Sequence, residues 1–86
     1  MAEEIMTADQ GVFIVNNTTE KTIDHNGIYV LEDTVFTSIK IGGADIKGTY
    51  IADTAAAVKA GSFIRPVFGA TFSGVQLTSG SVVLIL

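Results

Sequence analysis

One histidine and one adjacent pair of carboxylates are the residues of this 86-residue chain best suited to catalysis. His25 lies in the segment Asp24-His25-Asn26-Gly27, and an Asn-Gly pair favours a tight turn between two strands. A catalytic base at His25 would need an oriented acid and a nucleophile, but the side chain of Asp24, as its neighbour in a strand, points to the opposite face. The pattern therefore predicts that His25 belongs to a hairpin turn.

Glu32 and Asp33 are adjacent carboxylates, and neighbours in sequence diverge rather than face one another across a substrate. We interpret them as part of a solvated turn. The chain has no cysteine, its single histidine and scattered acids do not match a zinc or calcium site, and its glycines do not form a phosphate-binding motif. We therefore expect no enzyme, no catalytic residue, no cofactor and no metal.

The composition points to contacts with other protein surfaces. Hydrophobic residues make up 48% of the chain and charged residues only 16%, with a net charge of −4. Without a run of Lys or Arg, neither nucleic acid nor an anionic membrane is an expected partner. A small domain without disulfides often gains stability by oligomerising, so we expect a homo-oligomer or a complex with another protein.

The two ends of the chain bear on localisation. The segment MAEEIMTADQ has acids where a signal peptide has bases, and no apolar stretch follows it. The apolar run at the other end is far shorter than the roughly 20 residues of a spanning helix. We expect synthesis in a cytoplasm, which the protein leaves only within a larger assembly.

Turn-forming residues recur about every eight to twelve positions, between short segments rich in Val, Ile, Thr, Phe and Tyr. This spacing predicts an all-β fold, a small antiparallel sandwich or barrel of about seven or eight short strands. We expect a flexible arm at 1–10 and a single β domain at 11–86. The predicted strands are 11–16, 20–24, 27–31, 34–41, 46–52, 62–65, 71–77 and 81–86.

The segment 53–61 is the one helical candidate. Asp53 or Thr54 could cap a helix, three alanines favour it, and Gly61 could end it. The alternative is an extended loop whose small residues pack closely against a neighbour. We therefore expect at most one short helix, near 54–60.

The last residues form an uninterrupted apolar strand after the turn residues Thr78-Ser79-Gly80, so we predict a hairpin over 73–86. A strand that is apolar at every position is covered on both faces. One face can meet the core of the domain, and the other needs the opposite part of the chain or a symmetry mate. The predicted oligomer interface comprises Val82, Val83, Leu84, Ile85 and Leu86.

Further candidate contacts lie near the single proline and in the arm. Arg65 precedes Pro66 on an expected edge segment, and arginine and aromatic residues are favoured interface anchors. Phe63 belongs to the same segment, although Phe63 and Phe68 are each more typical of a core. In the arm, Ile5 and Met6 could dock on a neighbouring subunit, the alternative being disorder.

The C-terminal third resembles the end of small virion proteins of tailed bacteriophages. The matching features are Gly61 with Phe63, the strand 72–77, the turn Ser79-Gly80 and the apolar strand 82–85. The resemblance implies an all-β structural protein, often trimeric, that decorates a capsid or forms part of a fibre or tail, so the homo-oligomer that we expect is a trimer. Pro66 departs from the pattern, which leaves the register of the hairpin open.

Two specific functions are compatible with these features, and a bacterial β-barrel subunit of a host complex is a third, generic possibility. The first is a capsid decoration (cement) protein of the virion, which would bind the major capsid protein or another virion protein through its surface. The alternative is a carbohydrate-recognition β-module of a fibre or tail. That function requires exposed aromatic residues, for which Tyr29 and Tyr50 are the candidates.

Overall fold

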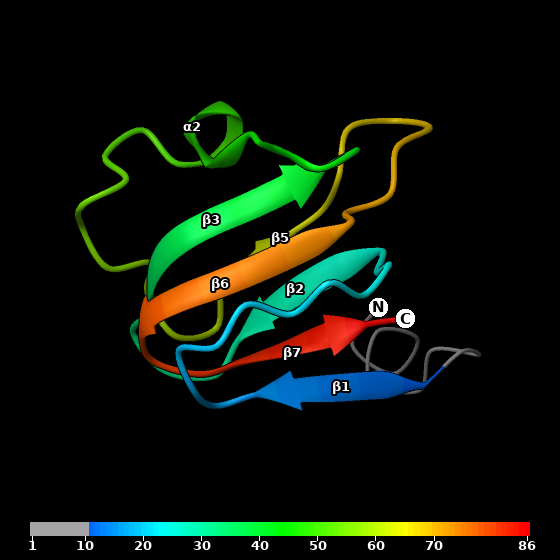
Figure 1. Cartoon of the computed structure of the whole chain (residues 1–86). Helices are drawn as coiled ribbons and strands as arrows, with labels where there is room; N and C mark the ends of the chain where they lie inside the picture. The colour runs from blue at the N-terminus through cyan, green and yellow to red at the C-terminus, as the bar shows by residue number, and fades with distance from the viewer. Residues whose placement is uncertain (1–10) are drawn as a thin grey trace.

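The computed structural model describes residues 11–86, so the predicted arm at 1–10, with Ile5 and Met6, lies outside the described residues. Seven strands form two antiparallel sheets, joined by loops and one short helix (Figure 1). The chain thus has a β-sandwich-like all-β fold, which confirms the predicted fold class.

The larger sheet has four strands in the order β1-β7-β2-β5. The last strand of the chain, β7, is central, with β1 on one side and β2 on the other. These two neighbours bond the backbone of β7 along both edges, and the apolar side chains of β7 are all buried. The bounds are β1 (Val12–Val15), β2 (Gly27–Val30), β5 (Phe63–Ile64) and β7 (Val82–Ile85).

The smaller sheet has three strands in the order β4-β3-β6. Its long central strand, β3, pairs with β4 at one edge and with β6 at the other. The short helix α2 follows β4. The bounds are β3 (Val35–Ile41), β4 (Ala44–Asp45), β6 (Gly74–Ser79) and α2 (Lys47–Tyr50).

The core lies between the two sheets and takes side chains from both. Phe36 and Ile39 of β3 both reach it, although strict alternation would place residues three apart on opposite faces. The register shifts between Phe36 and Ser38, so that Thr37 has no register partner in β6. This β-bulge places Phe36 and Ile39 on the same side of β3. The fully buried members of the core include Val15, Ile28, Val30, Ile39, Phe72, Val75, Leu77, Val82 and Leu84.

The predicted hairpin over 73–86 is wrong, because β6 and β7 belong to different sheets. The chain crosses between the layers at Gly80, whose φ of 97° is readily adopted only by glycine. Thr34 and Asp33 lie against Gly80 and leave no room for a Cβ. The Thr34 hydroxyl, whose shorter hydrogen bond of 2.7 Å goes to the Glu32 carbonyl, also lies 3.3 Å from the Ser81 carbonyl, next to the crossing.

The short helix is at Lys47–Tyr50 and not near 54–60. In the predicted segment, the Asp53 carboxylate accepts a hydrogen bond from the Ala55 N–H, which favours a local turn over a helix. Val58 then forms a bridge with Thr34, with backbone N–H···O distances of 2.7 and 2.9 Å in the two directions. The segment is therefore a loop, as in the alternative, but Ala55, Ala56 and Ala57 are exposed in this chain rather than packed closely against a neighbour.

Candidate interaction surface

One face of the four-stranded sheet points away from the core and is apolar. Cross-strand partners share a face, so the pairing of Ile14 with Val83, and of Val83 with Tyr29, places these side chains together. Their neighbours in sequence, such as Leu84, point into the core instead. We call this surface the outer face; it comprises Val12, Ile14, Tyr29, Phe63, Val83 and Ile85.

Exposure on the outer face is greatest along β1. Val12 and Ile14 are 42% and 56% exposed, whereas Val83 and Ile85 in the central strand are buried. Phe13, on the core side of the same strand, is also exposed because it lies at the edge of the sheet. Three consecutive apolar residues of β1 are thus accessible, which is unusual for a strand whose function is only to close a core.

The structure divides the predicted oligomer interface between two faces. Val82 and Leu84 are fully buried in the core of the chain itself, so only Val83 and Ile85 belong to the outer face. Leu86 is half-buried, and its N–H donates to the Gly11 carbonyl at 3.0 Å. A partner on this surface stays a prediction, and it would meet the exposed Val12 and Ile14 of β1 rather than the apolar run, because Val83 and Ile85 are only 4% and 7% exposed.

Phe63 and Arg65 lie together at the β5 end of the outer face. The Arg65 guanidinium lies over the Phe63 ring, 5.1 Å from its centroid. The Phe63 ring itself lies over Gly27, where a Cβ would come within 2.5 Å of the ring Cζ. Phe63 is therefore a half-buried surface residue and not a core residue. Arg65 forms no ion pair with any of residues 11–86, so its charge is available at the rim of this face.

A second apolar surface lies in the loop 65–70, which follows β5. Phe68 is fully exposed and Val67 is 53% exposed, which contradicts the assignment of Phe68 to the core. We call these two residues the loop patch. Pro66 and Gly69, with a φ of 83°, flank the patch and turn the chain away from the sheet.

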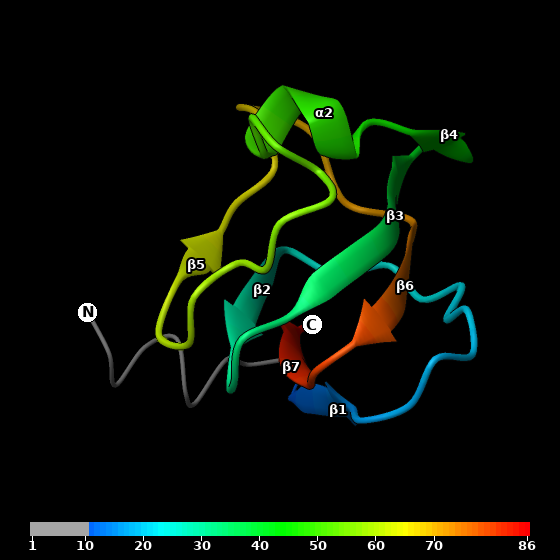
Figure 2. The ribbon, with the colours of Figure 1, turned by 90° about the vertical axis from the view of Figure 1, so that its left-hand side faces the viewer.

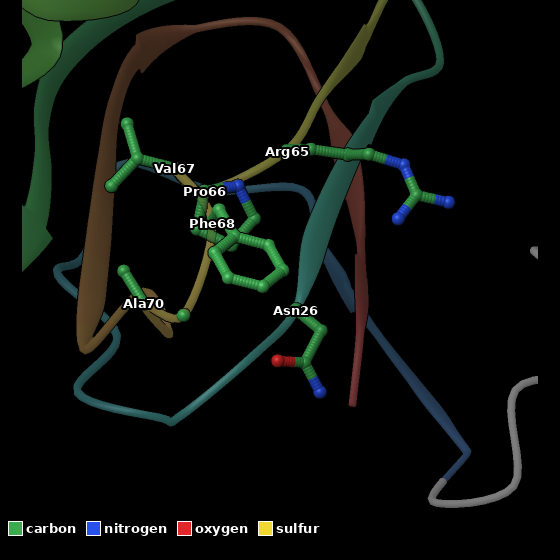
Figure 3. A pocket seen from close by; sticks show the side chains of 7 residues that line it. Asn26, Arg65, Pro66, Val67, Phe68 and Ala70 are labelled. Atoms are coloured by element: carbon green, nitrogen blue, oxygen red, sulfur yellow. The ribbon is translucent and has the colours of Figure 1, made fainter.

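The loop patch borders an open pocket of about 500 Å³. Figure 3 shows the Phe68 ring and the Asn26 side chain on its wall, with the Arg65 side chain directed away from them. The loop is held by the Tyr50 hydroxyl, which accepts a hydrogen bond from the Val67 N–H at 2.8 Å. The exposed residues thus project from an anchored segment, which reduces the entropic cost of binding.

The loop patch and β1 lie on opposite sides of the molecule. Figures 1 and 2, which are turned by 90° from one another, both show loop 65–70 at the top and β1 at the bottom. The described part of the chain is only 32 × 26 × 22 Å in extent. One small domain therefore presents apolar side chains in two directions.

The two tyrosines proposed for carbohydrate recognition have different surroundings. Tyr29 lies on the outer face, half-buried between β7 and β5. Tyr50 packs edge-to-face on Phe72 with ring centroids 5.6 Å apart, and its hydroxyl is used by the loop. Tyr50 thus positions the loop patch, a role that the sequence pattern did not indicate.

The prediction that His25 lies in a hairpin turn is wrong. His25 is 1% exposed and forms a bridge with Phe72, with both backbone N–H···O distances at about 3 Å. Its Nδ1 lies 2.6 Å from the Ile23 carbonyl and donates to it, while Nε2 has no partner in the described chain. Burial lowers the pKa of His25 below its usual value, against the smaller raising effects of the Ile23 carbonyl and Asp24.

The two carboxylates take part in loop structure. Glu32 accepts a hydrogen bond from the Ser81 hydroxyl at 2.7 Å, and Asp33 accepts one from the Ala60 N–H at 3.0 Å. This Ala60 bond, together with the charge of Lys59, lowers the pKa of Asp33. Within 11–86, no three residues among His, Cys, Asp and Glu are grouped so that they could hold a metal ion.

No helix in the described range is long and apolar enough to span a membrane. Comparison with protein-family models, with curated proteins and with solved structures found no match. The case for function therefore depends on the two exposed apolar surfaces of the chain itself.

Proposed function

We propose that this chain is a structural protein of a phage particle, most specifically a capsid decoration protein that stabilises the shell through surface contacts. The observation that supports it best is the pair of apolar surfaces on opposite sides of one small domain. A protein that holds an assembly together needs to contact at least two neighbours, and linked contacts reinforce one another.

The loop patch is suited to the contact with the shell. A fully exposed Phe on an anchored loop, beside a pocket of about 500 Å³, has the form of an interface anchor. Burial of one Phe side chain stabilises a complex by about 2 kcal/mol, or roughly thirtyfold in affinity. Repetition over many copies on a shell would multiply this effect.

The outer face is suited to contacts with neighbouring subunits. Its exposed members, Val12 and Ile14, continue an apolar surface that reaches across the sheet to Phe63. Arg65 adds one positive charge at the rim, in a chain whose net charge is −4. Apolar surface with Arg and aromatic residues and few other charges is the composition enriched in protein interfaces.

Rebinding to particles tests the proposal. Particles are prepared from the genome that encodes this chain with the gene deleted, and purified chain is added back. We expect saturable binding that raises the temperature at which the shells disrupt, and Phe68→Ser is expected to weaken this binding by at least about tenfold.

The matched control is Leu31→Ser, which removes an apolar side chain that is 43% exposed and belongs to neither surface. It is expected to bind as the wild type does. Failure of the wild-type chain to bind the deleted particles would contradict the proposal, as would equal loss of binding in both variants.

A further inference from the structure

The four edges of the two sheets differ in how they are protected. An edge strand carries unpaired N–H and C=O groups, and proteins usually shield them with charges, proline, short strands or covering segments. β4 has two residues, one of them charged, and β5 has two residues followed by Arg65 and Pro66. The open side of β6 is covered by Lys21, which exchanges backbone hydrogen bonds of 2.9 and 3.0 Å with Val75.

β1 has none of these protections in the described part of the chain. The Leu86 N–H donates to the Gly11 carbonyl, and antiparallel hydrogen bonding alternates along a strand. Residues 11, 13 and 15 therefore bond to β7, whereas the N–H and C=O groups of Val12 and Ile14 point to the open edge. These four groups form no hydrogen bond within residues 11–86, and no charge or proline occurs between Gly11 and Thr19.

We propose that β1 pairs with β1 of a second copy of this chain in antiparallel orientation about a two-fold axis. The pairing joins the two four-stranded sheets edge to edge. Centred on Phe13, it places Val12 of each copy opposite Ile14 of the other, and each such pair exchanges both N–H···O bonds. The register uses all the outward groups of the strand.

A second copy fits this edge because two antiparallel β1 strands present matching hydrogen-bonding groups and apolar side chains to one another. Val12 and Ile14 are on the same face, so the pairing continues the outer face of one copy into that of the other. Both strands are uncharged, so no like charges oppose one another across the axis. The inference rests on the proposed function, because it identifies the neighbouring subunit that contacts β1. The pairing leaves the loop patch free to contact the shell.

The test combines the native mass of the full chain with residue-resolved amide hydrogen exchange over a dilution series. Ile14→Lys places a charge on the open edge without removing a hydrogen bond of the fold. Leu31→Lys is the control, since it adds the same charge at a residue of comparable exposure outside β1. Wild type and Leu31→Lys are expected at twice the chain mass of 9.0 kDa, and Ile14→Lys at the single mass.

The exchange data identify the contact. The amides of Val12 and Ile14 are expected to exchange at least about tenfold more slowly in the concentrated than in the dilute sample, with Phe13 and Val15 protected in both. A single-chain or trimeric wild type would overturn the inference, as would a dimer in which the Val12 and Ile14 amides exchange at the dilute rate. If Ile14→Lys does not fold, these wild-type exchange rates decide alone.

The outcome is separable from that of the proposed function. A dimer with protected Val12 and Ile14 amides that does not bind particles would support the pairing and contradict the virion role. A chain that binds particles through Phe68 but shows no β1 pairing would support the virion role and overturn the inference.

Discussion

The Phe63 ring lies directly over Gly27, at a distance that a single added carbon would violate. The two residues are on adjacent strands, β5 and β2, and the absence of a side chain at Gly27 lets the tip of the ring come close to the Gly27 backbone. This relationship fixes the position of Phe63 and of the Arg65 guanidinium above it.

Gly27→Ala should therefore displace the Phe63 ring and lower the free energy of unfolding by about 1–2 kcal/mol. In a Phe63→Ala background the same change should cost less than about 0.5 kcal/mol, because the ring that it displaces is already absent. Urea denaturation of the four proteins of this double-mutant cycle measures the coupling. Additive effects would show that the ring does not depend on Gly27.

Gly80→Ala should be much more destabilising, because it combines a positive φ with a closed space. A Cβ there would lie 2.7 Å from both the Asp33 carbonyl and the Thr34 Cα, which are backbone atoms. We expect a loss of at least about 3 kcal/mol in the free energy of unfolding, or no folded protein.

Gly61→Ala is the matched control for Gly80→Ala. Gly61 has a similar φ of 89°, but nothing lies within 4 Å of its Cβ position. Gly61→Ala should lower the free energy of unfolding by only about 1 kcal/mol, which is the cost of placing an alanine at a positive φ. Thermal unfolding followed by circular dichroism compares the two, and equal losses would mean that the layer crossing is not tightly packed.

Acidification should weaken the fold through His25. The pKa of His25 is lowered in the folded protein from its usual value of 6.5, mainly by burial, so the unfolded chain binds a proton first as the pH falls. As the pH falls below 6.5, the free energy of unfolding should therefore decrease, by up to about 1.4 kcal/mol per pH unit. The loss continues until the folded-state pKa is reached.

Urea denaturation at neutral and mildly acidic pH measures this loss. His25→Gln, which cannot titrate, should remove this part of the pH dependence whatever its own stability at neutral pH. The Asp33 carboxyl titrates below its usual 3.8 and does not contribute in this range. If the stability of the wild type and of His25→Gln depended on pH in the same way, His25 would not be the group that destabilises the fold in acid.

Phe68→Ser should leave the fold unchanged, because the Phe68 side chain is fully exposed. We expect a change in the free energy of unfolding within about 0.5 kcal/mol. Phe72→Ser is the contrasting substitution, since Phe72 is fully buried and packs against both His25 and Tyr50. Comparable melting temperatures for these two variants would show that Phe68 has a structural role.

Six of the seven strands could be predicted because their residues alternate or are apolar, whereas β4 was not predicted and the segments 20–24 and 46–52, predicted as strands, contain none. In β3, Ile39 and Lys40 differ in face and in polarity, and β7 is apolar at every position and buried on both faces. These patterns reflect which side chains of a strand are buried, and this is visible in the order of apolar and polar residues along the sequence. They do not state which strands become neighbours.

The errors came from features that depend on distant residues. Thr78-Ser79-Gly80 has the composition of a hairpin turn, but the close contact of Gly80 with Thr34 makes it a crossing between layers. Likewise His25 is buried because Phe72, 47 positions later, pairs with it. No local pattern contains this information.

The loop patch was missed for a related reason. A Phe is more often buried than exposed, so the residue type alone favours a core position for Phe68. The signal that could have identified it is its position between Pro66 and Gly69, which together indicate a loop rather than a strand. The exposed strand β1 was predicted as a strand, but its place at an open edge was not.

Quantitative mass spectrometry of particles purified from the genome that encodes this chain tests the virion role most directly. We expect the chain to be present on these particles at a fixed copy number relative to the major shell protein, and to remain bound when they are washed at moderate salt, because the contacts are mainly apolar. Particles that lack the chain, or that carry it at trace and variable levels, would contradict a structural role in the virion.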